Sequence, residues 1–150
     1  MRRFVTPAGR ARFCWTALAL LLAGAAGCGG PKIYPVKGTV VYADGQLATD
    51  LAGYKVEFES IDGKIDGHGA SAEGEIQRDG TFQMTTLRPD DGALLGGHRV
   101  LISPPIPEGD TRAKPYVIDP RYLSYENSGL KVNVEPKVNE ITLTIERRKR

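Results

Sequence analysis

The feature that most constrains the fold of this chain is an apolar residue at every second position, a pattern that begins near Tyr34. In residues 53–60, GYKVEFES, the apolar side chains Tyr54, Val56 and Phe58 alternate with charged ones. Successive side chains of a β-strand point to opposite faces, so this pattern predicts a strand with one buried and one exposed face.

Further segments share this alternation. Their small or apolar positions are Val36, Gly38 and Val40; Phe82 and Met84; Val100 and Ile102; Leu130, Val132 and Val134; and Ile141, Leu143 and Ile145. Residues 68–77 are smaller and more polar, and predict a less regular strand. With about seven short strands and frequent turn signals, the pattern predicts an all-β fold, a seven-stranded antiparallel β-sandwich.

Turn residues suggest how some of these strands connect. Asp79-Gly80 predicts a hairpin turn that leads into the strand around Phe82. The short loop at residues 136–139 predicts a second hairpin, between the last two alternating segments. Asp119 followed by Pro120 predicts a single helical turn in the long connection at residues 104–128, because Asp caps helices and Pro suits their first position.

The N-terminal segment has a different composition. Residues 1–14 contain four arginines and no acidic residue, and residues 15–27, WTALALLLAGAAG, carry no charge. A basic start, a short apolar run and a small-residue end are the layout of a helical secretory signal peptide. The uncharged run is shorter than the roughly 20 residues of a transmembrane helix, which favours a cleaved signal over residues 1–27.

Cys28 follows this segment directly. Residues 25–28, AAGC, resemble the bacterial lipobox, although Ala25 stands where that motif usually has Leu. The resemblance implies cleavage before Cys28 and a diacylglycerol on its sulfur, with palmitate-type chains anchoring the protein in a membrane. The alternative is an ordinary cleavage site with Cys28 as a free thiol, which is disfavoured because exported proteins meet an oxidising compartment. Residues 28–33 then form a short tether.

Net charge argues against one class of partner. The whole chain has 20 basic and 18 acidic residues, but the four arginines of residues 1–27 leave a formal charge of −2 for residues 28–150. A nucleic-acid-binding domain needs a basic surface of its own, so no nucleic-acid partner is expected. The basic tail at residues 147–150 is expected to be solvated, with contact to anionic headgroups as the alternative.

One group of side chains suggests a binding patch. Tyr116, Arg121, Tyr122 and Tyr125 lie close together in the long connection, and tyrosine with arginine is enriched in binding surfaces. The alternative is that these tyrosines close one end of the fold and expose only their hydroxyl groups.

Catalytic and metal-binding patterns are not evident. His68 and His98 have no second histidine or cysteine at a zinc-ligand spacing, so both are interpreted as exposed or edge residues. The Asp-Gly pairs lack the ligand series of a calcium loop, and Ser71 lacks the context of a nucleophile elbow. The prediction is therefore no enzyme, no metal and no cofactor.

Several motifs in order resemble a carboxypeptidase regulatory-like domain, the transthyretin-like (prealbumin-like) fold found in bacterial lipoproteins. The segments that carry this resemblance are VKGTV (36–40), DGQLA (44–48), YKVEF (54–58), RDGTF (78–82), GGHRVLI (96–102), PRY (120–122), SGL (128–130) and NEI (139–141). The resemblance covers residues 34–146 and implies a non-enzymatic accessory domain. Residues 49–53 depart from it, since the family usually has a proline-led entry into the next strand there.

Together these features predict a lipid-anchored lipoprotein of the cell envelope, at the outer membrane or periplasmic face. Its domain would be structural or bind another protein, and the alternative is an accessory module that binds carbohydrate or peptide. The expected partners are the membrane, through the N-terminal lipid, and an envelope protein or polysaccharide. An enzyme of an unrecognised type would need a cluster of polar residues that the sequence does not reveal.

Overall fold

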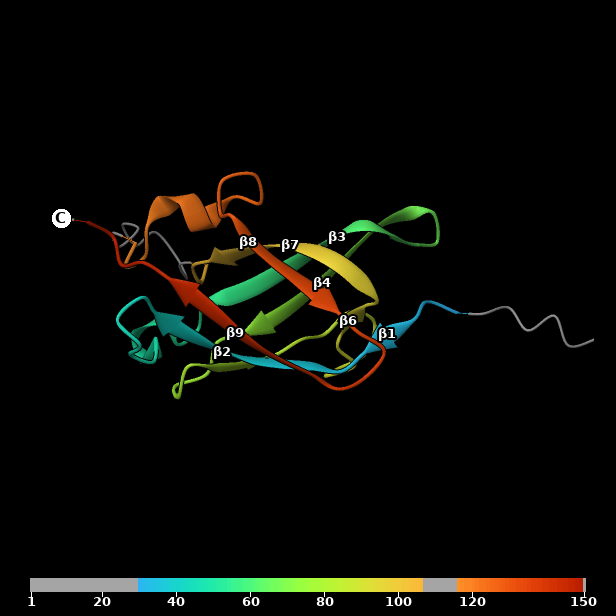
Figure 1. The fold of residues 1–150 in the computed structure, drawn as a ribbon, viewed down its shortest axis with the longest axis horizontal. Helices are drawn as coiled ribbons and strands as arrows, with labels where there is room; N and C mark the ends of the chain where they lie inside the picture. Colours follow the sequence, from blue (N-terminus) through green and yellow to red (C-terminus); the bar gives the residue numbers. More distant parts are fainter. Residues whose placement is uncertain (1–29, 107–115, 150) are drawn as a thin grey trace, which may run out of the picture. The chain divides into compact units, whose positions relative to one another are not determined.

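The computed structural model describes residues 30–106 and 116–149, which form an all-β domain with two short 3₁₀ helices (Figure 1). The predicted signal peptide and Cys28 lie outside these residues. Within the described part of the chain, no helix has the length and apolar character needed to cross a membrane.

One sheet has four antiparallel strands in the order β4-β3-β7-β8. Its strands are β3 (Lys55–Ile65), β4 (His68–Glu75), β7 (Gly96–Ser103) and β8 (Leu130–Val134). Phe58 pairs with Val100, and Val100 pairs with Leu130, so the apolar residues of three strands share one face. The less regular segment at residues 68–77 does form a strand, β4, with small buried residues on its inner face.

The second sheet has three strands in the order β5-β2-β9. These are β2 (Val36–Tyr42), β5 (Thr81–Gln83) and β9 (Asn139–Ile145). β2 and β9 are parallel along their full lengths, from Val36 opposite Asn139 to Tyr42 opposite Ile145. The prediction of antiparallel pairing is therefore wrong for this pair, because β9 returns to the first long strand of the domain instead of pairing with its predecessor.

The predicted hairpin between the last two strands is also wrong. β8 pairs with β7 in the four-stranded sheet, and β9 pairs with β2 in the other. Asn139 holds the connection between them. Its Oδ1 accepts from the Glu135 N–H at 2.9 Å, and its Nδ2 donates to the carbonyls of Glu135, Lys137 and Pro35 at 3.1, 2.7 and 3.3 Å. These bonds satisfy backbone polar groups of the connection and attach it to Pro35, at the point where the chain passes from one sheet to the other.

The predicted turn at Asp79-Gly80 is present, but its strands separate. Asp79 Oδ1 accepts from the N–H and the hydroxyl of Thr81, at 3.0 and 2.6 Å. After this turn β5 pairs with β2, so β4 and β5 belong to different sheets. The turn therefore carries the chain across an edge of the domain.

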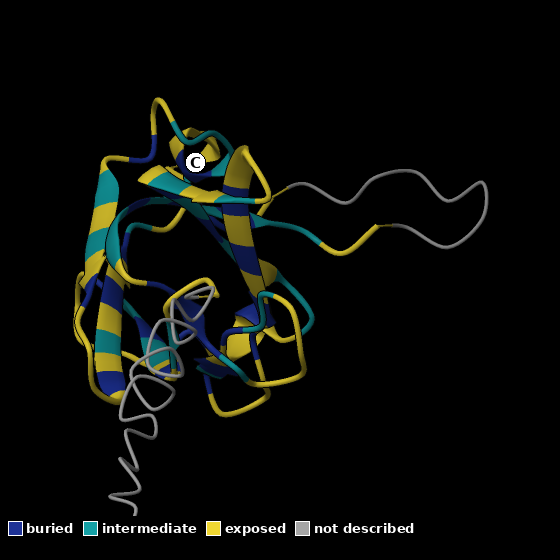
Figure 2. Ribbon diagram, turned by 90° about the vertical axis from the view of Figure 1, so that its right-hand side faces the viewer, coloured by how far each residue is buried: buried dark blue, intermediate teal, exposed yellow. Residues whose placement is uncertain are grey.

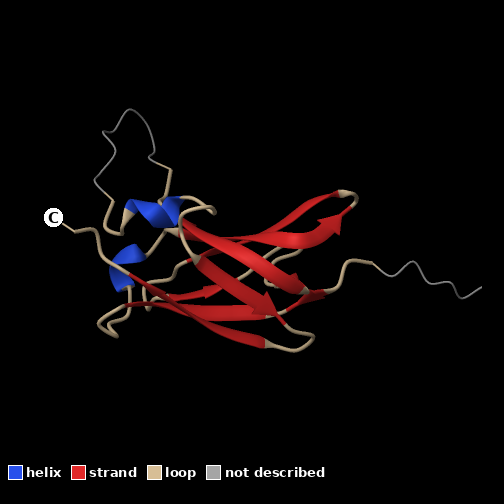
Figure 3. Cartoon of the chain, turned by 45° about the horizontal axis from the view of Figure 1, so that its top comes forward, coloured by secondary structure: helices blue, strands red, loops and turns tan. Residues whose placement is uncertain are grey.

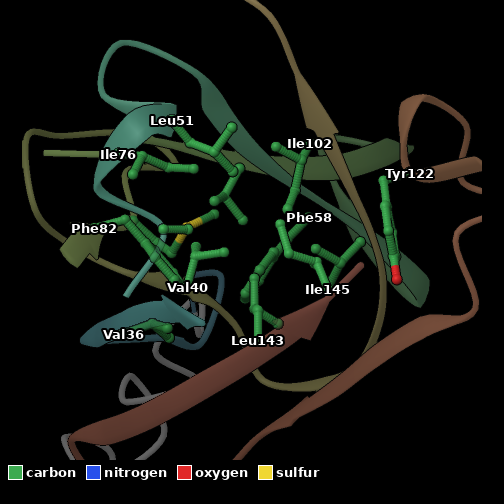
Figure 4. Packing of buried hydrophobic residues seen from close by; sticks show 14 of the residues in the cluster. Val36, Val40, Leu51, Phe58, Ile76, Phe82, Ile102, Tyr122, Leu143 and Ile145 are labelled. Atoms are coloured by element: carbon green, nitrogen blue, oxygen red, sulfur yellow. The ribbon is translucent and has the colours of Figure 1, made fainter. Parts of the chain in front are cut away.

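The core lies between the two sheets, and its side chains come from the inner faces of both (Figure 4). The predicted inward residues Val36, Val40, Phe82, Met84 and Ile102 are all buried. Bands of buried and exposed residues alternate along the strands (Figure 2). Burial of this apolar surface is the main favourable term in folding.

Smaller elements complete the two ends of the domain (Figure 3). At the end where residues 30–33 join it, called the entry end below, β1 (Ile33–Tyr34) pairs with β6 (Ala93–Leu94). The opposite end holds the C-terminal segment and the helices η1 (Thr49–Leu51) and η2 (Pro120–Leu123). η2 is the predicted turn, with the Asp119 side chain accepting from the Arg121 N–H at 3.0 Å.

Candidate functional site

An open groove of about 1040 Å³ lies beside the three-stranded sheet. Two cross-strand rows on the outer face of that sheet line it. Register places Thr39 between Thr81 and Thr142, and Lys37 between Gln83 and Glu140. In-register neighbours on one sheet face lie about 5 Å apart, so each row is a continuous strip of polar groups.

The groove continues to the edge of the other sheet. Lys55, Glu73 and Glu75 line this side, where β4 and the end of β5 approach each other through the Glu73–Thr85 bridge. Lys55 donates to Glu73 at 2.9 Å, and this hydrogen bond is the main cause of the raised pKa of Lys55. The groove is therefore bounded by strands of both sheets.

Its charges are paired across strands. Lys37 lies 2.9 Å from Glu140 in the outer row, as Lys55 does from Glu73. These groups are largely exposed, so each pair contributes little stability. Hydroxyls, an amide and exposed ion pairs suit hydrogen bonding to a polar ligand. Within the described residues, no group of three His, Cys, Asp or Glu side chains is arranged to hold a metal ion.

The predicted aromatic patch is divided by burial. Tyr122 is only 2% exposed and belongs to the core cluster, as Figure 4 shows. Its hydroxyl accepts from the Glu146 N–H at 3.0 Å and from Arg121 at 2.6 Å. The Arg121 guanidinium covers the ring at 4.7 Å and lies 3.3 Å from the Glu146 carboxylate. Tyr122 thus closes one end of the domain, and its ring face is not available for a ligand.

The other two tyrosines occupy different surroundings. Tyr125 is half-buried, and burial, with the carboxylates of Glu57 and Glu59 adding to it, raises its pKa to about 12. Tyr116 is exposed and adjoins residues 107–115, which lie outside the described residues. The ring contacts of the described residues join Phe58 to Phe82 and His98, and do not join these tyrosines.

The two histidines differ sharply. His68 is exposed at the start of β4, as predicted. His98 is 1% exposed on the inner face of β7, so its interpretation as an exposed or edge residue is wrong. The strand alternation itself places His98 on the same face as Val100 and Ile102, a signal that could have indicated its burial.

The start of the basic tail is attached to the domain. Arg147 donates to Asp50 at 2.7 Å, and its guanidinium lies 3.6 Å from the centre of the Tyr42 ring. The Arg148 N–H donates to the Val117 carbonyl at 2.9 Å. Burial and the hydrogen bond to Asp50 raise the pKa of Tyr42, so its phenol stays neutral as a donor. Arg147 is therefore a structural residue of the end opposite the entry end.

The spacing of residues in the sequence does not reveal the groove. Its threonine row combines three strands that are distant in the chain, and only the parallel β2–β9 pairing aligns Thr39 with Thr142. No family model, curated protein or solved structure matches this chain.

Proposed function

We propose that this protein is a cell-envelope lipoprotein in which a lipid on Cys28 holds a non-enzymatic β-domain beside a membrane. The observation that carries the proposal is the AAGC motif at the end of an uncharged run, followed within five residues by the first strand at Ile33. Cys14, the only other cysteine, lies in the predicted signal. A lipid is a specific role for a cysteine at this position, whereas an exposed free thiol would be open to oxidation.

The domain itself is proposed to be a seven-stranded, prealbumin-like β-sandwich. Support comes from the three-stranded and four-stranded sheets, whose inner faces contribute to one core. The short β1–β6 pair lies outside these seven strands. Such a domain would act as an interaction or structural module, a role that the paired, exposed charges on its side support.

The two cysteines allow a matched test of the anchor. Cys28→Ser removes the lipid acceptor, and Cys14→Ser is the control within the signal. We expect C28S to be absent from the membrane fraction that detergent extracts. The C14S variant should be present there in the same amount as the wild type. Equal membrane retention of C28S and the wild type would contradict the proposed anchor.

A second candidate function is recognition of a polar envelope polymer by the groove. The threonine row and the adjacent Gln83–Lys37–Glu140 row favour this reading, since they offer donors and acceptors on one sheet face. Binding of the lipoprotein to cell-wall polysaccharide would be measured for Thr142→Val, with Thr144→Val as control. Thr144 lies on the same strand and is also exposed, but it does not line the groove. We expect weaker binding by T142V alone, and an equal effect of both changes would refute a role for the groove.

A further inference from the structure

The entry end of the domain exposes four large apolar side chains, which we call the entry rim. They are Ile61, Leu87, Leu95 and Val138, with exposed fractions of 53%, 57%, 36% and 60%. Single exposed apolar residues are ordinary on protein surfaces, and Leu47, Tyr116 and Val117 are exposed elsewhere on the domain, so exposure alone does not identify a contact surface. The entry rim differs from these residues because the short tether of residues 28–33 leads to it.

Each rim residue is tied to the segment through which the chain enters the domain. The Leu95 N–H donates to the Lys32 carbonyl at 2.8 Å, and Ile61 packs beside Gly97, two residues further along. Val138 precedes Asn139, whose N–H donates to the Pro35 carbonyl at 2.9 Å. The backbone at Leu95 and beside Val138 therefore lies directly against the entering segment, and Ile61 lies next to the start of β7.

Leu87 is linked to the same segment through Gly92. This glycine, at φ +101°, lies so close to the Tyr34 carbonyl that a side chain would collide with it. Between Leu87 and Gly92, Asp91 accepts from the N–H groups of Thr86, Leu87 and Arg88 at 2.7, 3.0 and 2.9 Å. The loop is thus organised by its own hydrogen bonds, with Leu87 held outward.

The tether places a membrane close to this end. Cys28 and Ile33 are five residues apart, and an extended chain of that length spans at most about 18 Å. An anchor at Cys28 would therefore hold the entry end within a short distance of the lipid headgroups. Tethering also raises the local concentration of the two surfaces into the millimolar range, so even a weak apolar contact is populated.

We propose that the entry rim rests in the interfacial layer of the membrane that holds the Cys28 lipid, so that the domain stands with its C-terminal end directed away. This proposal rests on the proposed lipid anchor. Basic side chains such as Lys32, Lys64 and Arg88 are interspersed with Asp62, Asp66 and Asp90 at this end. Because the charges are mixed, the contact depends on apolar insertion and does not require anionic lipid.

The opposite end provides the comparison. Leu47, which forms an isolated bridge with Val41 of β2, is 50% exposed, close to the 57% of Leu87. Arg147 is held there by Asp50 and Tyr42. If the domain stands on the entry rim, Leu47 stays in water while Leu87 meets lipid.

Tryptophan fluorescence can test this orientation. The only tryptophan of the chain, Trp15, lies in the predicted signal. The variants Leu87→Trp and Leu47→Trp therefore each give a single reporter in the processed lipoprotein, and Val138→Trp is a second rim reporter. Each full-length lipoprotein would be reconstituted in phosphatidylcholine vesicles with brominated acyl chains, after circular dichroism confirms an unchanged fold.

We expect L87W and V138W to shift to shorter emission wavelengths and lose intensity to the brominated lipid. L47W should keep its emission and remain open to acrylamide from the aqueous phase. If all three variants float with the vesicles but none is quenched by bromine, the anchor stands and the rim proposal is wrong. If the protein does not float, the proposed anchor fails and the rim proposal fails with it.

Discussion

His98 is a buried side chain with an unsatisfied polar atom. Its Nε2 lies 2.7 Å from the Leu94 carbonyl, which fixes this nitrogen as the donor of a neutral ring. Nδ1 is then a buried acceptor without a partner among the described residues, and the ring packs against Phe58 at 5.7 Å between centroids. Burial lowers the pKa of His98, so the domain holds this histidine in its neutral form.

The first prediction concerns acid stability. An unfolded histidine takes up a proton below about pH 6.5, whereas buried His98 resists protonation until lower pH. The contribution of His98 to stability is thus complete above about pH 6.5 and is lost progressively as pH falls below it. Chemical unfolding measured at several pH values should show this loss in the wild type and in the exposed control H68N. The variant H98N should lack it, and an identical pH dependence in all three proteins would refute the assignment.

Gly38 lies where the surrounding atoms leave no space for a side chain. A Cβ at this position would collide with the Phe82 ring and with the Ile141 carbonyl, because neighbouring strands of the same sheet close over it. The second prediction is that Gly38→Ala lowers the free energy of unfolding by about 1–3 kcal/mol, as overpacking of a core does. Gly69→Ala is the matched control in β4, where nothing lies within 4 Å of the added carbon. Equal stability of both variants in urea titration would show that the sheet relaxes around the methyl group.

At the scale of elements, the sequence indicates strands better than their partners. The alternation of Val56 and Phe58 specifies which face of β3 is buried, because that choice depends on local periodicity. The alternation of Leu143 and Ile145 is equally clear, yet β9 pairs in parallel with a strand about a hundred residues earlier. A short loop before β9 suggests a hairpin, and the crossing depends on bonds from Asn139 that alternation does not encode.

The third prediction tests that crossing. Asn139→Ala removes one acceptor and one donor group that together serve four backbone partners in the β8–β9 connection. Leaving such buried groups unsatisfied costs about 1–3 kcal/mol, so N139A should be destabilised by that amount. Asn139→Asp keeps the acceptor for the Glu135 N–H but faces three carbonyls with a carboxylate, and should be destabilised at least as much. A fully stable N139D would contradict the assigned hydrogen bonds.

The candidate sites show the same division between local and long-range information. The sequence places Tyr122 in a group of tyrosines that either form a binding patch or close one end of the fold. Its burial depends on the helical turn η2, which packs its ring against the core. The groove requires Thr39, Thr81 and Thr142 to come from three strands in one register. Sequence spacing gives the residue types of these sites but not the tertiary partners that bury or align them.

At the scale of the whole molecule, we propose separate roles for the two ends of the domain. The entry end receives the chain from Cys28 and carries the entry rim. The opposite end holds η1, η2 and the C-terminal segment (Figures 1 and 3). The side chain of Tyr122 and that of Arg147 on the Tyr42 ring close it. The groove lies along the side, where β5, β2 and β9 face outward. A module held at one end would leave this side open to partners in the envelope.

Intact-mass measurement of the protein extracted from native membranes decides whether Cys28 carries a lipid anchor. We expect a chain that begins at Cys28 and carries the added mass of a diacylglycerol, with or without a third acyl chain. A chain that retains residues 1–27, or one that begins at an unmodified Cys28, would contradict it.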